Sequence, residues 1–171
     1  MEAVKLELMD ESVDLLTSIL VKYPVINTVD LNFTNKLITI SFLIDDVITY
    51  DSWQKQKEVL KKNFRLYNKF ENKKTTKFKL VKNDYQNLTK IDLIRSLKDL
   101  SNQELDFMIK VIKNNFTNKI LQNEEMYYKE QLESIDKLLQ EINQSNFQKK
   151  EINYLAFREE DRVLIFDKNN K

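Results

Sequence analysis

Apolar residues recur at spacings of three and four near the start of the chain, between residues 13 and 23. Such spacings place side chains on one face of a helix. We therefore predict a first helix that Asp10 or Ser12 caps and that Pro24 ends. Its apolar residues are Val13, Leu15, Leu16, Ile19, Leu20 and Tyr23.

Two segments in which apolar and polar residues alternate follow at 25–33 and 36–44, and the dipeptide at 34–35 separates them. Alternation is typical of a strand with one buried face, and a turn at 34–35 sets Val29 opposite Ile40. The second turn residue is an asparagine, which tolerates positive φ better than most residues. The hairpin collects Val29, Leu31, Phe33, Ile38, Ile40 and Phe42 on one face, and Thr28, Asp30, Asn32, Thr39 and Ser41 on the other.

Helical spacing returns from about residue 51 to residue 70, and we expect Asp51 or Ser52 to cap this second helix. A strand is predicted after it, at 75–82. The apolar side of the helix carries Trp53, Leu60, Phe64 and Tyr67.

Two shorter helices are predicted between residues 89 and 117. Thr89 with Asp92 opens the first of them, and a capping box of Ser101 and Glu104 opens the second. The aligned apolar residues are Leu93, Leu97 and Leu100 in the first helix, and Leu105, Met108, Ile109, Ile112 and Phe116 in the second.

The longest helix is predicted from about residue 118 to residue 143. Its apolar spacing fills about two heptads, and a sustained coiled coil needs roughly three or four. A helix that lies across a sheet is therefore preferred, and self-association through 118–143 stays open as the alternative. The apolar residues are Leu121, Tyr128, Leu132, Ile135, Leu139 and Ile142.

A second hairpin is predicted at the end of the sequence. A two-residue turn at 160–161 pairs Phe157 with Leu164, whereas a three-residue loop would set Arg158 opposite Arg162, a like-charged pair. Both faces are apolar, so we expect burial on both sides, within the fold or, as the alternative, against a partner. One face carries Leu155, Phe157, Leu164 and Phe166, and the other Ile152, Tyr154, Ala156, Val163 and Ile165.

Together these elements predict a single α+β domain over residues 1–171. It has two β-hairpins, one additional strand and about five helices, the longest near the C-terminal end (about 118–143). Its sub-parts are a helix plus hairpin (1–50), a basic helix plus strand (51–82), a helical pair (83–117) and a long helix plus C-terminal hairpin (118–171).

Three residue types are missing from the chain, and each absence excludes a kind of chemistry. Without cysteine there are no disulfides, thiolate metal sites or thiol nucleophiles. Without histidine, hydrolase triads and histidine-based metal sites are excluded, and without glycine so are the usual phosphate-binding loops. We expect no cofactor and no bound metal, and a binding protein is favoured over an enzyme.

The first residues lack the basic and apolar pattern of a signal peptide, and no apolar run approaches the ~18 residues of a membrane helix. We therefore expect an intracellular, cytoplasmic protein that does not enter a membrane. Frequent Lys, Asn and Ile are typical of an AT-rich genome.

Charge is unevenly distributed, although the total is only +1. Eleven basic residues against two acidic ones give 55–82 a net charge of +9, whereas 1–54 holds nine acidic residues against three basic ones. Interleaved with aromatic residues, such a segment could bind RNA or single-stranded DNA, because lysine neutralises phosphate and aromatic rings stack on bases. The alternatives are an acidic protein partner, or the ordinary solvated face of an amphipathic helix. The eleven residues are Lys55, Lys57, Lys61, Lys62, Arg65, Lys69, Lys73, Lys74, Lys77, Lys79 and Lys82.

The main hypothesis is thus a non-enzymatic binding or regulatory module that acts through protein–protein contacts. Nucleic-acid binding through 55–82 is the alternative. A Mg²⁺-dependent nuclease is a remote one, in which Asp46 or Asp51 would hold the metal with Glu71, and Lys73 would help to activate water. More simply, Asp45 and Asp46 end a strand, and the acids Glu124, Glu125, Glu130, Glu133 and Asp136 form a solvated helix face.

Overall fold

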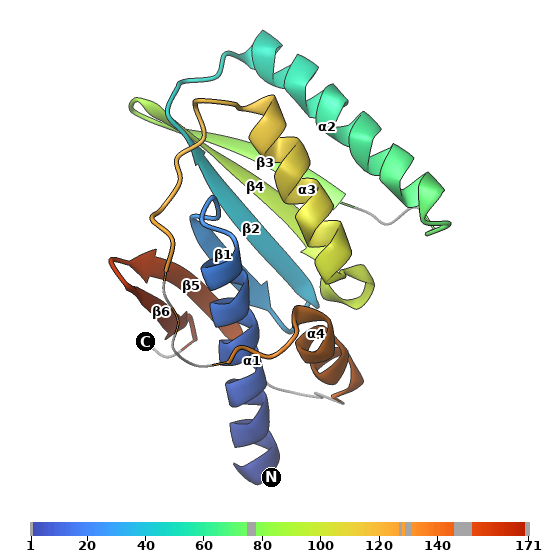
Figure 1. Cartoon of the computed structure of the whole chain (residues 1–171), viewed down its shortest axis with the longest axis vertical. Helices are drawn as coiled ribbons and strands as arrows, with labels where there is room; N and C mark the ends of the chain where they lie inside the picture. The colour runs from blue at the N-terminus through green and yellow to red at the C-terminus, as the bar shows by residue number, and fades with distance from the viewer. Residues whose placement is uncertain (1, 75–77, 127, 129–130, 146–151, 170–171) are drawn as a thin grey trace.

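A six-stranded antiparallel sheet runs through the computed structural model, in the order β3-β4-β2-β1-β5-β6 (Figure 1). The structure describes residues 2–74, 78–126, 128, 131–145 and 152–169. The strands are β1 (Thr28–Asn32), β2 (Leu37–Ile44), β3 (Phe78–Tyr85), β4 (Leu88–Ser96), β5 (Asn153–Glu159) and β6 (Arg162–Asp167). The helices are α1 (Glu2–Lys22), α2 (Tyr50–Phe70), α3 (Asn102–Asn115) and α4 (Ile135–Gln144), and a short 3-10 helix, η1 (Leu97–Asp99), follows β4.

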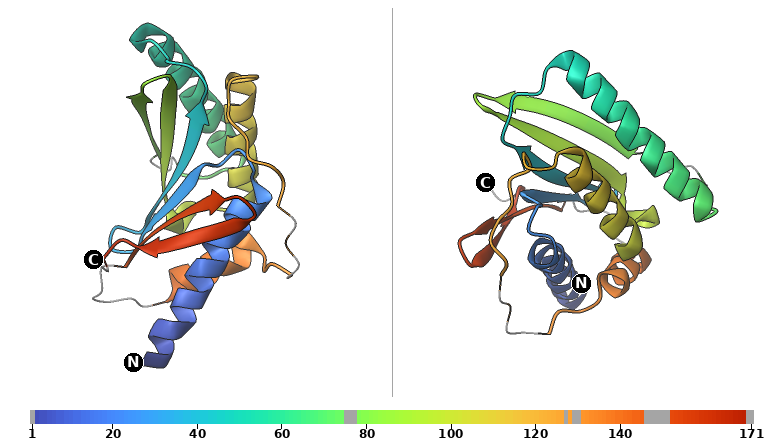
Figure 2. Two further views of the ribbon diagram at one scale, coloured as in Figure 1. Left: turned by 90° about the vertical axis from the view of Figure 1, so that its left-hand side faces the viewer. Right: turned by 45° about the horizontal axis from the view of Figure 1, so that its top comes forward.

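The α-helices lie on one face of the sheet, and no described helix lies on the other face (Figure 2). The helix α1 packs against α4 and lies over β1, β5 and β6, and α4 also contacts η1, whereas α2 and α3 pack together near β3 and β4 (Figure 1). Side chains that point from the strands toward the helices form one core with the helices' apolar faces, and Leu16, Ile40 and Leu93 are fully buried in it. The predicted α+β class is confirmed.

The first hairpin has the predicted register, with Val29 opposite Ile40. Both side chains are fully buried beneath the helices. The turn at 34–35 is also correct, but the positive φ (51°) falls on Lys36 and not on Asn35. A left-handed residue just after a two-residue turn also closes a hairpin. The alternation therefore determined the register, but not which residue carries the strain.

The predicted helix at 89–100 is wrong, because this segment forms β4 and then η1. The leucine spacing fits a helix, but every second side chain of β4 is buried, which is the period of a strand. As a strand the segment pairs with β2 on one side and β3 on the other, so its backbone hydrogen bonds are satisfied along both edges. Of the strand predicted at 75–82, residues 78–82 belong to β3 and 75–77 lie outside the described residues.

The predicted long helix at 118–143 is wrong as well, since among the described residues of that segment only those of α4 are helical. Asn118 has a φ of 66°, and Ser134 caps α4 by accepting a hydrogen bond from the Lys137 N–H. Between them the N–H groups of Leu121 and Asn123 bond to carbonyls of β2 and of the loop after α1 (2.8 and 2.9 Å). The segment is too polar to gain much by helical packing. The longest helices are instead α1 and α2, with 21 residues each.

Only α3 begins with its predicted cap, since Ser101 Oγ accepts the N–H of Glu104 (3.2 Å). The helix α1 is helical from Glu2, and Thr49 caps α2. Serine and aspartate are also common in the first turn of a helix, so their presence does not fix which residue is the cap. The wrong caps are Asp10 and Ser12 for α1, and Asp51 and Ser52 for α2.

The terminal hairpin has the predicted register, with the turn at 160–161 and Phe157 opposite Leu164. Glu160 takes the left-handed conformation there (φ 54°). A non-glycine residue pays about 1 kcal/mol or more for that conformation. Because β5 also pairs with β1, the hairpin continues the sheet and is not an appendage.

Only one face of this hairpin is buried, so the expected burial on both sides is wrong within the described residues. Tyr154 and Ala156 enter the core. The other face lies on the side of the sheet that has no helix (Figure 2). There Phe166 is 51% exposed and its ring stacks on Phe157, with 5.6 Å between the centroids. We call Leu155, Phe157, Leu164 and Phe166 the outer patch.

Candidate functional site

The helix α2 buries one narrow side and exposes the rest. Trp53, Leu60, Phe64 and Asn68 are the buried residues, at spacings of seven, four and four. The Phe64 ring packs edge-on against Phe78 of β3, with 4.9 Å between the centroids. This side anchors α2 at the rim of the sheet, and its opposite side faces away from the molecule (Figure 1).

Exposed cations form a line along the outward side of α2. Lys55, Lys62 and Lys69 are seven residues apart, so they succeed one another about every 10 Å along the helix. Arg65 lies beside them. Within the described residues none of these four enters an ion pair, and the nearby Glu58 is engaged by Lys61 (3.4 Å). This line is therefore free to meet an external negative charge.

A second exposed line, of apolar residues, runs beside the cations. Val59, Leu66 and Phe70 are 49%, 44% and 81% exposed. Single exposed apolar side chains are ordinary, but three in a row on one helix face mark a contact surface. We name the seven residues of the two lines, Lys55, Val59, Lys62, Arg65, Leu66, Lys69 and Phe70, the basic–apolar face.

The other predicted basic residues lie elsewhere. Lys73 pairs with Glu104 (3.5 Å), and Lys82 donates to the carbonyl of Ile48 (2.8 Å) and pairs with Asp84. Lys57 and Lys61 are half-buried on the flank of α2, and Lys74 is exposed beyond its end. Lys79 is exposed on β3, on the face of the sheet away from the helices, and Lys77 lies outside the described residues.

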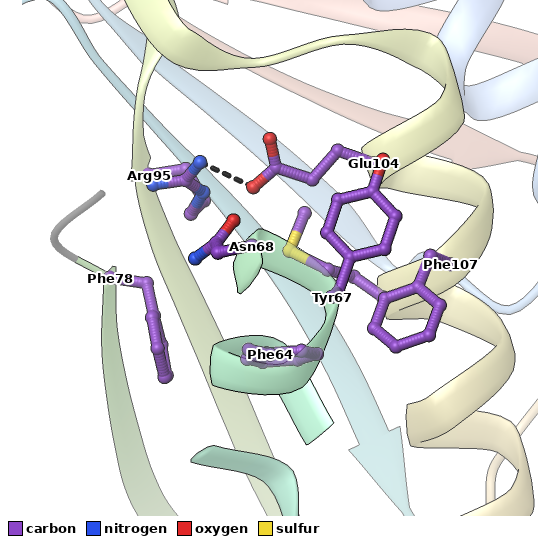
Figure 3. A pocket seen from close by; sticks show the side chains of 8 residues that line it. Phe64, Tyr67, Asn68, Phe78, Arg95, Glu104 and Phe107 are labelled. Carbon is purple, nitrogen blue, oxygen red and sulfur yellow. Dashed lines mark hydrogen bonds and ion pairs between the residues drawn. The ribbon is translucent and has the colours of Figure 1, made fainter. Parts of the chain in front are cut away.

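A buried ion pair lies beneath α2 and was missed by the sequence analysis. Arg95 of β4 and Glu104 of α3 are joined there, 1% and 3% exposed (Figure 3). The signal was the alternation in β4, which places residue 95 on the same buried face as Ile91 and Leu93. The second Glu104 oxygen and Asn68 Oδ1 have no hydrogen-bond partner within the described residues. They line a cavity of about 10 Å³, room for one water molecule and no more.

A larger hollow, of about 370 Å³, opens between α1 and the segment before α4. Among the described residues that line it, the one cation, Lys22, is already engaged by Asn102 (2.8 Å) and Asp106 (3.2 Å). Tyr23 lies next to it and donates a hydrogen bond to Asp106 (2.6 Å). Burial, followed by this bond to a carboxylate, raises the pKa of the Tyr23 hydroxyl. A phenol with a raised pKa is a poor base near neutral pH, so this constellation is structural.

The structure does not bring the candidate nuclease residues together. The 21 residues of α2 separate Asp51 from Glu71 and Lys73 by about 30 Å. Asp46 pairs instead with Lys119, which lowers the pKa of that carboxyl. Across the described part of the chain, no three Asp or Glu side chains are grouped to hold a metal ion.

The acids that were assigned to the long helix are likewise dispersed. Glu124 and Glu125 are exposed before α4, Glu133 pairs with Lys137 (3.0 Å), and Asp136 accepts a hydrogen bond from the Asn102 N–H (2.7 Å). Glu130 lies outside the described residues.

Comparisons with protein-family models, with curated proteins and with solved structures find no match to this chain. None of the described helices combines the length and the apolar character needed to span a bilayer. The arguments for function therefore rest on the surface of the molecule, and above all on the basic–apolar face.

Proposed function

We propose that this chain is a non-enzymatic, intracellular binding module whose basic–apolar face docks an acidic, amphipathic helix of a partner protein. The observation that carries the proposal is the pair of parallel lines on α2, one of exposed cations that form no ion pair with any described residue and one of exposed apolar side chains. A surface that only kept the protein soluble would not expose Phe70, whose side chain is 81% accessible.

The spacing of the apolar line favours a helical partner. Val59, Asn63, Leu66 and Phe70 follow one another at four, three and four residues, which is the seam of a two-helix coiled coil. Lys62 and Lys69 flank that seam, in the positions that pair with acidic residues of the opposite helix. Asn63 donates one amide N–H to the Val59 carbonyl (2.9 Å), and its Oδ1 is left to accept a hydrogen bond from a polar residue of the partner helix.

The neighbouring helix extends the apolar line. Tyr67 stacks on Phe107 of α3 with 4.5 Å between the ring centroids, and Val111 lies half-buried one turn further along α3. A partner helix laid along α2 would therefore contact both helices. Such helix-on-helix recognition uses side chains at i, i+3, i+4 and i+7 as anchors.

Fluorescence anisotropy with a labelled designed peptide tests the proposal. The peptide carries leucine at heptad positions a and d and glutamate at e and g, and a scrambled peptide of the same composition is the control. We expect binding of the heptad peptide only, and its loss in Leu66→Glu and in the double variant Lys62→Glu, Lys69→Glu.

Lys79→Glu is the control variant, because it makes the same type of substitution, lysine to glutamate, on the opposite face of the sheet. It should bind the peptide as the unmodified chain does. Equal binding of the scrambled peptide, or binding that survives Leu66→Glu, would remove the basis for a helical partner.

Nucleic-acid binding is the second candidate, favoured by the lysine line and by the exposed ring of Phe70, which could stack on an unpaired base. A labelled uridine oligonucleotide in the same assay distinguishes the two. RNA binding should weaken steeply with salt and should be lost in Lys62→Glu, Lys69→Glu, but Leu66→Glu should retain most of it. No binding of peptide or RNA would contradict both candidates.

A further inference from the structure

The strand β6 forms one edge of the sheet, and within the described residues nothing pairs with its outer side. Glu159 and Arg162 flank a two-residue turn, so they form a hydrogen-bonded pair and the alternation continues at Leu164 and Phe166. The backbone groups of Val163, Ile165 and Asp167 therefore point away from β5. An unpaired row of this kind is a template for another strand.

The two edges of the sheet differ in how they are protected. The opposite edge strand, β3, places Lys82 on its helix-facing side and Lys79 on its other side, and it carries Asn83 and Asp84 before its last residue, Tyr85. Charged residues, lysine above all, are the usual means by which proteins block pairing at a sheet edge. Between its first and last residues β6 holds only Val163, Leu164, Ile165 and Phe166. Charged side chains therefore protect the edge formed by β3 against strand pairing, whereas the edge formed by β6 has no such protection.

We infer that β6 pairs with β6 of a second copy of this chain, antiparallel and with Leu164 opposite its own equivalent, so that two sheets join into one. A twofold axis perpendicular to the sheet keeps the helix-facing sides together, as strand pairing requires. Val163 of one copy then exchanges both backbone hydrogen bonds with Ile165 of the other. This surface lies apart from α2, so the inference does not depend on the proposed function.

Cross-strand neighbours select this register. With Leu164 at the centre, Arg162 lies opposite Phe166, whose ring can accept the guanidinium, and the turn residue Glu160 lies opposite Lys168. Like charges meet only where Asp161 faces Asp167, and Asp161 belongs to the turn.

The alternative register, centred on Ile165, is less favourable. It sets Arg162 opposite Lys168, a like-charged pair, and Val163 opposite Asp167.

The same pairing of β6 strands also removes part of the outer patch from solvent. Phe166 is exposed because its strand has no neighbour on one side. In the joined sheet a second β6 flanks its ring, and the two outer patches become continuous across the axis. The exposed apolar side chains of the hairpin are thereby partly covered, which explains why a sheet edge carries them.

Cysteine cross-linking tests this geometry cleanly, because the chain contains no cysteine of its own. Leu164→Cys would place two thiols across the axis in a non-hydrogen-bonded pair, where the Cα atoms lie about 4.5 Å apart and a disulfide can form. Mild oxidation should convert this variant of the full chain to a covalent dimer. Leu155→Cys is the control, since it lies in the same patch but on β5, away from the axis, and should form no covalent dimer under the same conditions.

Light scattering coupled to size exclusion provides the second readout. The unmodified chain should elute at twice 20.6 kDa, and Leu164→Lys, which opposes two charges at the axis, should elute as a folded monomer. Leu155→Lys should remain a dimer. A monomeric unmodified chain overturns the inference. So does a dimer that Leu155→Lys dissociates or that Leu164→Cys fails to cross-link, since either result indicates packing through the patch and not pairing of the edge.

Discussion

Arg95 and Glu104 form an ion pair that α2 covers, although the two residues lie on different elements, β4 and α3 (Figure 3). Both side chains are almost fully buried, and Lys73, which follows α2 in the chain, reaches the same carboxylate (3.5 Å). The pair therefore ties together a strand and two helices. It also fixes the position of α2, whose outward side is the basic–apolar face.

Removing one member of this pair should be costly. Arg95→Met leaves the Glu104 carboxylate buried without its main counter-ion, and such changes cost about 3–5 kcal/mol of unfolding free energy. Replacing both residues, as in Arg95→Met with Glu104→Leu, should cost much less than the sum of the two single changes, because no charge is left behind. Urea denaturation of the three variants gives the comparison.

An exposed ion pair serves as the control for that series. Lys137 of α4 and Glu133, which precedes the helix, are 3.0 Å apart on the surface, and Lys137→Ala should change the unfolding free energy far less than Arg95→Met does. If Arg95→Met lowers the unfolding free energy no more than Lys137→Ala does, the buried ion pair does not hold α2 in place.

The turns offer a second prediction, because a chain without glycine places non-glycine residues at positive φ. Glu160, with φ 54°, lies in the exposed turn of the terminal hairpin. Glu160→Gly relieves a strain of about 1–2 kcal/mol, and the added entropy of the unfolded chain offsets part of that gain. We expect a net stabilisation of about 0.5–1 kcal/mol in urea denaturation.

The residue before Glu160 is the matched control. Glu159 belongs to β5, so Glu159→Gly gains nothing from glycine's freedom and should be destabilising. Equal effects of the two substitutions would mean that the left-handed conformation carries no strain.

Hairpin registers were predictable because two independent features agreed. At Val29 and Ile40, the alternation and the position of the turn allow only one pairing that buries one face. At the terminal hairpin, avoiding the Arg158–Arg162 pair led to the observed register. In both hairpins, residues that are close together in the sequence determine the register, so the register can be predicted from the sequence alone.

The errors occurred where a local pattern fits two structures. The leucine spacing from 93 to 100 suits a helix, and only the neighbouring strands β2 and β3, far away in sequence, make β4 the better solution. The spacing in 118–143 likewise suits a long helix, but the polar residues between its leucines leave little to bury. Contacts with residues far away in sequence determine the structure of both segments, and the local sequence pattern contains no information about those contacts.

Only part of the candidate site was visible in the sequence. The lysine-rich composition of 55–82 pointed to α2, but the fold uses Lys73 and Lys82 for internal contacts and leaves Lys55, Lys62 and Lys69 to the surface. The exposure of Val59 and Leu66 depends on where α3 stops covering α2. This exposure depends on how the two helices pack, and the composition of the segment does not predict it.

Alkaline pH should weaken the fold through buried tyrosines, and Tyr23 provides the test. Its pKa is raised in the folded state, first by burial and then by Asp106, above the value of about 10 for an exposed tyrosine. The folded chain therefore retains a proton that the unfolded chain releases. The stabilisation is complete below pH 10 and declines as the pH rises above it.

Tyr23→Phe isolates this contribution. It should cost about 1 kcal/mol at pH 7, where the hydrogen bond to Asp106 is lost, and it should flatten the decline of the unfolding free energy above pH 10. Tyr67 and Tyr154 also have raised pKa values, so part of the decline should remain. A profile that Tyr23→Phe does not alter would contradict the assignment.

Truncation tests whether the terminal hairpin belongs to the core. A chain that ends at Gln148, which lies outside the described residues, lacks both β5 and β6. It would expose the edge of β1 and remove Tyr154 and Ala156 from the core, so we expect loss of the cooperative thermal transition and of near-ultraviolet circular dichroism. A chain that ends at Asp161 keeps β5 and should unfold cooperatively at a lower temperature. If the shorter chain still unfolds cooperatively, the sheet is complete without the hairpin, and the hairpin serves association alone.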